Sequence, residues 1–305
     1  MMQHTPDHHD GMTNTQLRGE SPADPAQAAH RRKQALAHAF SLAAEEYDEA
    51  NGGFFNPIGA KLAGLAGLRP GDRVLDVGCG RGAVLFAALA EVGPEGYVVG
   101  VDLAPGMVRA TCSEATGRGL RNVSVRVDDA EALGFPDHSF EAALSSFAVI
   151  FTPDPAAALA SLHRVLVPGG RLGFTAFGAD EPGWERPGAA LNAFLPPEAA
   201  RLRQSRAARF NPLGRSPEEA AELLHRSGFT DVRTIEYPAA THYPDAEAWW
   251  RSQRAGGWRG VLEAIPAGRL DEAKQAALAA LAPLGAPDGS LVRRTAIRYT
   301  TALRE

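Results

Sequence analysis

The sequence has few cysteines, no long apolar run and no excess of positive charge. Its two cysteines, Cys79 and Cys112, are too few for a disulfide framework and are not spaced as zinc ligands, so we expect the reducing cytoplasm. No apolar run approaches the roughly 18 residues of a membrane span, and the polar first residues lack the apolar core of a signal peptide. A formal net charge of −5 provides no cationic field for duplex nucleic acid, so we expect no such partner.

What the sequence does contain is enough apolar material for a sizeable core. With 45% hydrophobic and 22% charged residues, the 305-residue chain fits one large α/β domain or two small ones. A chain of this length buries roughly three-quarters of the surface that its unfolded form exposes.

The N-terminal part changes character near residue 26. Residues 1–25 are polar, with His4, His8 and His9 among them, and we expect a disordered tail that offers a metal no fixed geometry. Residues 26–47 repeat apolar side chains at spacings of three and four, which predicts an amphipathic helix. A shorter helix follows at about 57–67. We interpret residues 26–70 as a helical lid that can also pack on a neighbouring subunit in a homo-oligomer.

From residue 71 onward, short apolar strands alternate with helices of about ten residues. This alternation predicts a doubly wound, Rossmann-like α/β fold with a parallel sheet. The expected strands are 73–77, 97–101, 122–127, 140–145 and 171–177, and the expected helices are 83–92, 105–116 and 156–166. A helix at 217–227 follows, and two more strands, 231–237 and 293–302, pair antiparallel at one edge. The result is a seven-stranded sheet whose last strand is antiparallel, with helical lid insertions at about 179–215 and 238–290.

The most informative stretch is a glycine-rich loop between the first strand and the next helix. Gly78 and Gly80 let the backbone turn sharply and let a ligand lie against bare main chain at the carboxyl edge of the sheet. With Ala83 they also satisfy the dinucleotide pattern G-x-G-x-x-G/A, so the glycines leave the ligand open.

Three carboxylates at successive strand ends narrow that choice. Asp76 stands two residues before Gly78, where it would repel a pyrophosphate but attract an ammonium or sulfonium. Asp102 ends the second strand and can accept two ribose hydroxyls, and Asp129 follows the third strand near the position of an adenine amine. Together they indicate a nucleoside with a cationic tail and no phosphate. Taken singly, Asp76 and Asp102 could instead be caps, and Asp129 a solvated loop residue.

Four segments of the chain occur in the order and spacing of a known family. They are "RPGDRVLDVGCGRG", "VVGVDLAPGMV", "DDAEALGFPDHSFEAALSSFAVIF" and "LHRVLVPGGRLGFTAF", over about residues 70–178. In them the sequence resembles the class I S-adenosylmethionine-dependent methyltransferases, in the branch with the ubiquinone/menaquinone C-methyltransferases and many small-molecule methyltransferases of bacterial secondary metabolism.

The resemblance implies a set of donor contacts. It places Asp76, Gly78, Cys79 and Gly80 at the methionine part of S-adenosylmethionine and Asp102 at the ribose. Leu103 and Met107 would flank the adenine, Asp129 and Ala130 would contact its edge, and Ser145 would contact the amino-acid end through its backbone. Tyr47 matches a tyrosine whose ring closes over the donor in this branch. Because methyl transfer needs no thiol, we read Cys79 as a small loop filler.

The acceptor side is less defined. An in-line methyl transfer chiefly needs alignment of acceptor, methyl and sulfur, so a base is optional. The candidate catalytic residues are Tyr47, His242 and Glu181. Aromatic residues in or beside loops at the carboxyl edge could line an acceptor pocket: Phe54, Phe55, Phe147, Phe151, Trp184, Trp249 and Trp250. An arginine run from 201 to 215 is a solvated helical face or, alternatively, contacts an anionic acceptor.

Taken together, we predict a cytoplasmic methyltransferase that converts S-adenosyl-L-methionine to S-adenosyl-L-homocysteine and acts on a small-molecule metabolite, without metal. We favour O-methylation, and C- or N-methylation of an aromatic, quinone-like or isoprenoid acceptor is the alternative. An NAD-dependent oxidoreductase and a non-catalytic donor-binding protein are the rivals from other classes.

Overall fold

A computed structural model describes residues 25–47, 51–203, 210–255 and 258–305. The tail predicted at residues 1–25 lies outside this range, apart from its last residue. None of the described helices is both long and apolar enough to cross a lipid bilayer.

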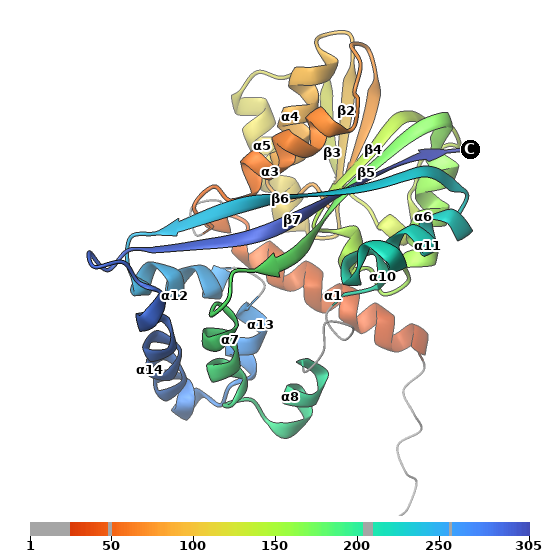
Figure 1. Ribbon diagram of the computed structural model, residues 1–305. Coiled ribbons are helices and arrows are strands. Elements are labelled where there is room, and N and C mark those ends of the chain that lie inside the picture. Colours follow the sequence, from red (N-terminus) through yellow and green to blue (C-terminus); the bar gives the residue numbers. More distant parts are fainter. Residues whose placement is uncertain (1–24, 48–50, 204–209, 256–257) are drawn as a thin grey trace, which may run out of the picture.

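The centre of the molecule is one seven-stranded sheet with the strand order β3-β2-β1-β4-β5-β7-β6 (Figure 1). The strands are β1 (Arg73–Val77), β2 (Tyr97–Asp102), β3 (Val123–Val127), β4 (Phe140–Ser146), β5 (Leu166–Asp180), β6 (Phe229–Tyr243) and β7 (Leu291–Arg304). Strands β1 to β5 pair in parallel, and β7 runs antiparallel to both β5 and β6. The predicted Rossmann-like seven-stranded sheet with its last strand antiparallel is therefore confirmed.

The two C-terminal strands are longer than the sequence predicted. The prediction ended the sixth strand at residue 237, before Pro238, whereas β6 continues to Tyr243 and Pro238 pairs with Ala296. Proline is tolerated there because β6 is the edge strand, where a missing N–H breaks no interior ladder. The second insertion therefore begins at residue 244, not at 238.

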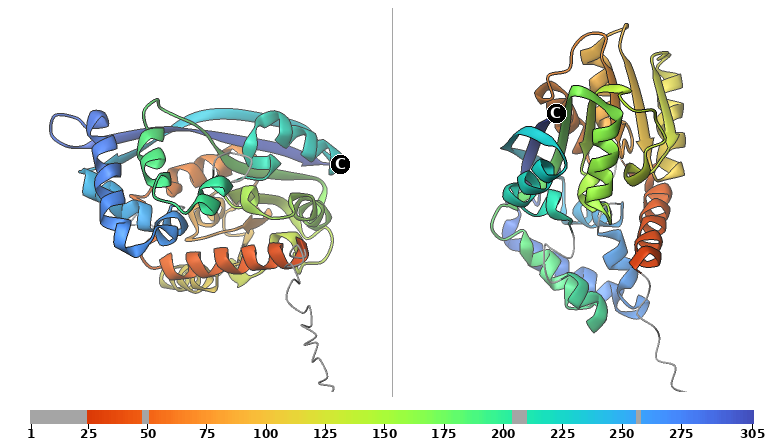
Figure 2. Two further views of the ribbon diagram at one scale, coloured as in Figure 1. Left: turned by 90° about the horizontal axis from the view of Figure 1, so that it is seen from below. Right: turned by 90° about the vertical axis from the view of Figure 1, so that its right-hand side faces the viewer.

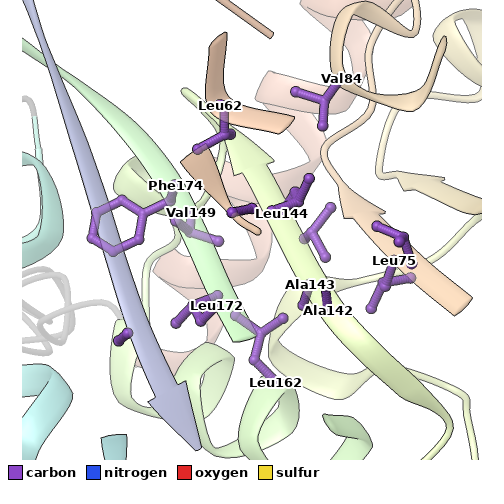
Figure 3. Close-up of a cluster of buried hydrophobic side chains, with 14 of the residues drawn as sticks. Leu62, Leu75, Val84, Ala142, Ala143, Leu144, Val149, Leu162, Leu172 and Phe174 are labelled. Atoms are coloured by element: carbon purple, nitrogen blue, oxygen red, sulfur yellow. The ribbon is translucent and has the colours of Figure 1, made fainter. Parts of the chain in front are cut away.

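The core lies between the sheet and the helices on both of its faces. Strand β1 is buried except at Arg73, because both of its faces are covered, and Val74 and Leu75 are fully buried. Figure 3 shows side chains of β1, β4 and β5, including Leu144 and Phe174, meeting Leu62 from one face and Leu162 from the other.

The helices on one face are α3 (Phe55–Leu65), α4 (Ala83–Val92) and α5 (Pro105–Gly117); α6 (Pro155–Val165) and α11 (Pro217–Arg226) cover the other (Figure 1). Sequence signals fix where two of them begin. Asp154 caps α6 by accepting a hydrogen bond from the Ala157 N–H, and Ser216 caps α11 in the same way.

A helical cap lies beside the end of the β6–β7 hairpin where β6 ends and β7 begins. It consists of α7 (Glu185–Asn192), α8 (Pro197–Arg203), α12 (Ala246–Ala255), α13 (Arg259–Ala264) and α14 (Leu270–Leu281). Its apolar cluster, which includes Trp184, Trp249, Trp250 and Leu281, is separate from the cluster around the sheet. The cap therefore has a small core of its own.

Helix α1 (Pro25–Ala43) lies across the carboxyl ends of the parallel strands. The sequence predicted this helix to residue 47, but the α-helix ends at Ala43 and turns follow. Seen from below, α1 runs lengthwise across the molecule, and its C-terminal end points toward the cap (Figure 2, left).

Candidate functional site

A cavity opens at the carboxyl ends of β1 to β4. Its volume is about 1080 Å³, including its open mouth. The floor comes from the loops that follow these four strands, and Phe40, Tyr47 and Phe55 form part of its cover. This is the point where the strand order reverses on either side of β1, the usual place for a ligand in an open α/β sheet.

The glycine loop after β1 is held in place by backbone hydrogen bonds. The N–H groups of Gly78 and Cys79 donate to the Val101 carbonyl at 2.8 and 2.9 Å. Gly78 has φ of +69°, and a Cβ on it would lie 2.1 Å from the Cβ of Ala148. A side chain is therefore excluded here on conformational and steric grounds.

Asp76 is a buried carboxylate at the cavity wall. It is 1% exposed, and neither of its oxygens has a partner at normal hydrogen-bond geometry among the described residues. Burial raises the pKa of Asp76 to about 8; the Leu85 backbone opposes this shift and the Asp102 carboxylate adds to it. A buried carboxyl without a partner is costly, so a cationic ligand at this position would be stabilising.

Asp102 joins two loops of the cavity. Its Oδ2 accepts a hydrogen bond from the Gly80 N–H at 2.9 Å, and its Oδ1 accepts one from the Ala104 N–H at 2.8 Å. Burial raises the pKa of Asp102, while these two bonds oppose the shift. The N-cap of α5 is Ala104, without a side-chain cap, so Asp102 is not the helix cap that the sequence left open. Carboxylate oxygens accept more than one hydrogen bond, which leaves capacity for hydroxyl donors.

The loop after β3 contacts the cavity through the neighbours of Asp129. Asp128 and Ala130 line the cavity, whereas Asp129 caps a short 3₁₀ helix, η1 (Ala130–Ala132), and pairs with Lys33 of α1 at 2.7 Å. Lys33 also pairs with Glu131 at 2.5 Å. Lys33 therefore ties α1 to this loop.

The remaining predicted donor residues lie at or just behind the cavity wall. Leu103 and Met107 line it, and Cys79 lines it with a thiol whose pKa is raised well above its ordinary value, chiefly by burial. A protonated, buried thiol suits a filler more than a nucleophile. Ser145 is buried behind the wall, where its hydroxyl donates to the Val77 carbonyl, and its neighbour Ser146 lines the cavity.

Aromatic rings form the other end of the cavity. Phe55, Phe147 and Phe151 line it, and Phe54 packs on the first two. Tyr47 stacks on Phe55 at 5.2 Å between centroids. The prediction missed Phe177, which stacks on Phe147 at 4.2 Å, although its place at the end of the fifth strand was a usable signal. It also missed several residues that line the cavity directly: Leu36, Ala37, Phe40, Arg81, Ser146 and Thr152.

Several predicted acceptor-side residues lie elsewhere. Trp184, Trp249 and Trp250 are 4–8% exposed and form part of the cap core, because large indoles bury much apolar surface. Glu181 pairs with Arg294 at 3.3 Å away from this cavity, and His242 lines a second cavity. Of the arginine run, residues 206 and 209 fall outside the described residues. Within the described part of the chain, no three His, Cys, Asp or Glu side chains group as metal ligands.

Fold and cavity together define a class of protein. A methyltransferase domain family matches residues 74–170. The chain belongs to this family and is a class I S-adenosylmethionine-dependent methyltransferase, as the sequence resemblance predicted.

Two curated relatives support that assignment. The nocamycin O-methyltransferase of Saccharothrix syringae is 41% identical over 219 residues, which cover 68% of this chain and 77% of that protein. The aklanonic acid methyltransferase DauC of Streptomyces sp. (strain C5) is 47% identical over 143 residues, which cover 47% of this chain and 65% of that protein.

Among solved structures, the YcgJ protein from Bacillus subtilis superposes with a TM-score of 0.56. It is 21% identical, and the match covers 82% of this chain and 99% of that chain. At this identity the likeness concerns the fold alone.

Proposed function

We propose that this protein transfers the methyl group of S-adenosylmethionine to an oxygen atom of a small-molecule metabolite in natural-product biosynthesis. The observation that carries the proposal is the buried Asp76 carboxylate beside the glycine loop, which has no hydrogen-bond partner in the described part of the chain. The names of the two relatives, an O-methyltransferase and a methyltransferase of an acid, favour oxygen as the acceptor atom.

The residues of the first cavity fit this donor. Asp76 would receive the ammonium of the methionine part, and the bare backbone at Gly78 leaves room for it. Asp102 would accept the ribose hydroxyls, and Leu103, Met107 and Ala130 would contact the adenine. The donor brings a methyl group on a sulfonium that is already a good leaving group.

The chain's own contribution to the rate is chiefly positioning and exclusion of water. Tyr47 and Phe55 cover the cavity from the side of α1, and Phe147 and Phe151 provide an apolar wall for the acceptor. Alignment of the reacting groups can supply roughly 7–11 kcal/mol of such a barrier.

The described wall of this cavity offers an acceptor few bases. Its ionisable side chains are those of Tyr47, Asp76, Cys79, Arg81, Asp102 and Asp128. The three carboxylates lie at the loops assigned to the donor, and Tyr47 is the one such group that stacks among the acceptor-side rings. We infer that the acceptor oxygen is acidic by itself, as in a carboxylic acid or an acidic phenol, with Tyr47 as the candidate base otherwise.

Two further expectations accompany this proposal. We expect the enzyme to work in the cytoplasm on a free small molecule, without nucleic acid. A homo-oligomer that contacts through α1 stays a prediction.

Parallel thermal unfolding with S-adenosylhomocysteine, adenosine and NAD tests the donor. S-adenosylhomocysteine at about 100 times its Kd should stabilise the fold by about 2.7 kcal/mol, and adenosine should stabilise it less at the same concentration. Stabilisation by NAD alone would overturn the proposal.

Incubation with a methyl-labelled donor and cell extract then tests the acceptor atom. A label released by mild alkali identifies a methyl ester, and a label that resists alkali but is lost under ether cleavage identifies a methyl ether. A label that resists both treatments would indicate C- or N-methylation instead.

A further inference from the structure

A second cavity lies between the end of α1 and the helical cap. Its volume is about 2250 Å³, including its open mouth. Leu42, Ala43 and Glu46 form one side, and residues of β6, α12 and α13 form the other. Phe40 and Tyr47, from the same stretch of chain, line the first cavity, so the end of α1 is a wall common to both.

Two arginines face this cavity without a counter-ion among the described residues. Arg251 and Arg254 of α12 line it, and neither has a carboxylate within 4 Å among the residues that the structure describes. Some other arginines at the protein surface do have such partners, as in the pairs Arg226–Glu222, Arg233–Asp231 and Arg269–Glu272. The guanidinium groups of α12 are therefore available to an anion.

The orientation of α12 is fixed by its opposite side. Trp249, Trp250, Ser252 and Gln253 are buried in the cap, and the Gln253 side chain donates to the Trp249 carbonyl at 3.1 Å. Ala248, Arg251 and Arg254 recur every three residues and face the cavity together. Rotating the helix to turn the arginines away would expose both tryptophans.

The rest of the lining gives the cavity a mixed character. Arg259 is paired with Glu263 at 2.8 Å, so this pair adds little net charge. Glu46 contributes one negative charge against the two guanidinium groups of α12, and His242 adds an imidazole ring. Apolar side chains complete the wall, among them Tyr243, Leu262 and Ile265. An excess of positive charge beside apolar surface fits an oxyanion carried on an apolar body.

We propose that this cavity binds the methyl acceptor by a carboxylate or phosphate group distant from the oxygen that is methylated, through Arg251 and Arg254. Arginine donors match the geometry of both oxyanions. That the bound anion is the methyl acceptor rests on the proposed function, whereas the presence of an anion site does not. The acceptor class is thereby narrowed to molecules with one oxyanion for anchoring and another oxygen for methylation.

The test uses the full-length protein saturated with S-adenosylhomocysteine, so that the first cavity is filled. Three probes are titrated by calorimetry: 2-naphthoate, 2-naphthyl phosphate and the neutral methyl 2-naphthoate. We expect one or both anions to bind, and the neutral ester to bind at least about tenfold more weakly. The preferred anion identifies the anchoring group. Equal affinity for the ester and the anions would overturn the proposal.

Matched variants locate the site. The double variant Arg251→Gln/Arg254→Gln should weaken anion binding at least about tenfold. Arg121→Gln, an exposed arginine outside both cavities, should leave anion binding unchanged. An unchanged S-adenosylhomocysteine affinity shows that each variant is folded. Anion binding that survives the double substitution would overturn the site.

Failure of the proposed function has a different signature. If S-adenosylhomocysteine fails to bind the wild-type protein, the donor assignment falls. The anion titration without S-adenosylhomocysteine, compared between wild type and the double variant, still decides whether the second cavity holds an oxyanion.

Discussion

The two cavities on either side of the end of α1 are built in opposite ways. The first is formed at the ends of the parallel strands, around the bare backbone of the glycine loop, and the carboxyl groups of Asp76, Asp102 and Asp128 line it. The second is formed by side chains of helices and of β6, and Arg251 and Arg254 give it an excess of positive charge. A site formed around backbone at fixed strand ends accepts one ligand shape. A site formed by side chains can change its ligand through a few substitutions. This fits a constant methyl donor and a variable acceptor.

The apolar interiors behind the two cavities are separate as well. The donor cavity rests on the cluster around the sheet, and the second cavity rests on the cap cluster around Trp249 and Trp250. If the two clusters also contribute to stability independently, a substitution in one of them should affect only the cavity that rests on it.

The largest effect is expected in the cap. Trp249→Ala removes a 4%-exposed indole from the cap cluster and should destabilise the cap by about 3–5 kcal/mol. Hydrogen exchange should show faster exchange in α12 to α14, while calorimetry shows S-adenosylhomocysteine affinity within about threefold of wild type. Trp249→Phe is the milder control. Equal loss of donor affinity would mean that the two regions unfold as one.

Gly78→Ala should damage the donor cavity almost as severely. The added Cβ meets Ala148 in a residue with φ of +69°, so we expect donor affinity to fall by at least about 3 kcal/mol, more than 100-fold. Gly64→Ala in α3, where a Cβ meets nothing within 4 Å, is the control and should be neutral or slightly stabilising. Retention of donor affinity in Gly78→Ala would contradict the assigned donor position.

Asp76 predicts a pH dependence of donor binding. The donor's ammonium requires the ionised carboxylate, so raising the pH from 6 to 8 should strengthen S-adenosylhomocysteine binding about 50-fold when the folded pKa is about 8. The folded chain also holds this proton more tightly than the unfolded chain, so the ligand-free protein should lose stability between pH 4 and pH 8. Asp76→Asn should flatten both trends, and what is left of them would come from Asp102, whose pKa is also raised; the same slopes in that variant would exclude Asp76 as their source.

Asp102→Ala should weaken S-adenosylhomocysteine binding by about 1–3 kcal/mol, because the ribose loses its acceptor. The fold should also lose some stability, since the Gly80 and Ala104 N–H groups lose their shared partner. Calorimetry and thermal unfolding separate these effects. An unchanged affinity together with a lowered Tm would restrict Asp102 to joining the two loops.

Lys33→Ala should have the smallest effect. It removes the ion pairs from α1 to Asp129 and Glu131, which we expect to contribute about 1 kcal/mol or less. Stopped-flow measurements should show S-adenosylhomocysteine dissociating up to about fivefold faster, since α1 covers its cavity less firmly. Arg32→Ala, an exposed neighbour on the same helix, should leave that rate unchanged.

The donor half could be predicted from sequence because its signals are local. The first strand at 73–77 and the helix at 83–92 have the observed bounds, and the glycine loop lies between them. Asp76 and Asp102 were located because each stands at a strand end, and parallel strands end at one edge. The other contacts around this cavity are tertiary and could not be predicted. Lys33 pairs with Asp129, which lies 96 positions away in the chain, and no spacing pattern in the sequence predicts that pair.

The acceptor half could not be predicted in the same way, because it depends on contacts between segments that are distant in the sequence. The tryptophans looked like pocket residues in the sequence because each stands near a predicted loop, but helices from two separate insertions meet and bury them. His242 and Glu181 were chosen by residue type, which does not specify position. The arginines proposed for the second cavity, Arg251 and Arg254, could be singled out only from the structure, in which no described carboxylate pairs with them.

The position of β7 has a consequence for how this chain is made. β7 inserts between β5 and β6, although it follows both in the sequence. During synthesis the edges of β5 and β6 that β7 covers therefore stay open until residues 291–304 leave the ribosome, and such edges are prone to pairing with other chains. The nascent protein is most vulnerable to aggregation just before its last strand arrives.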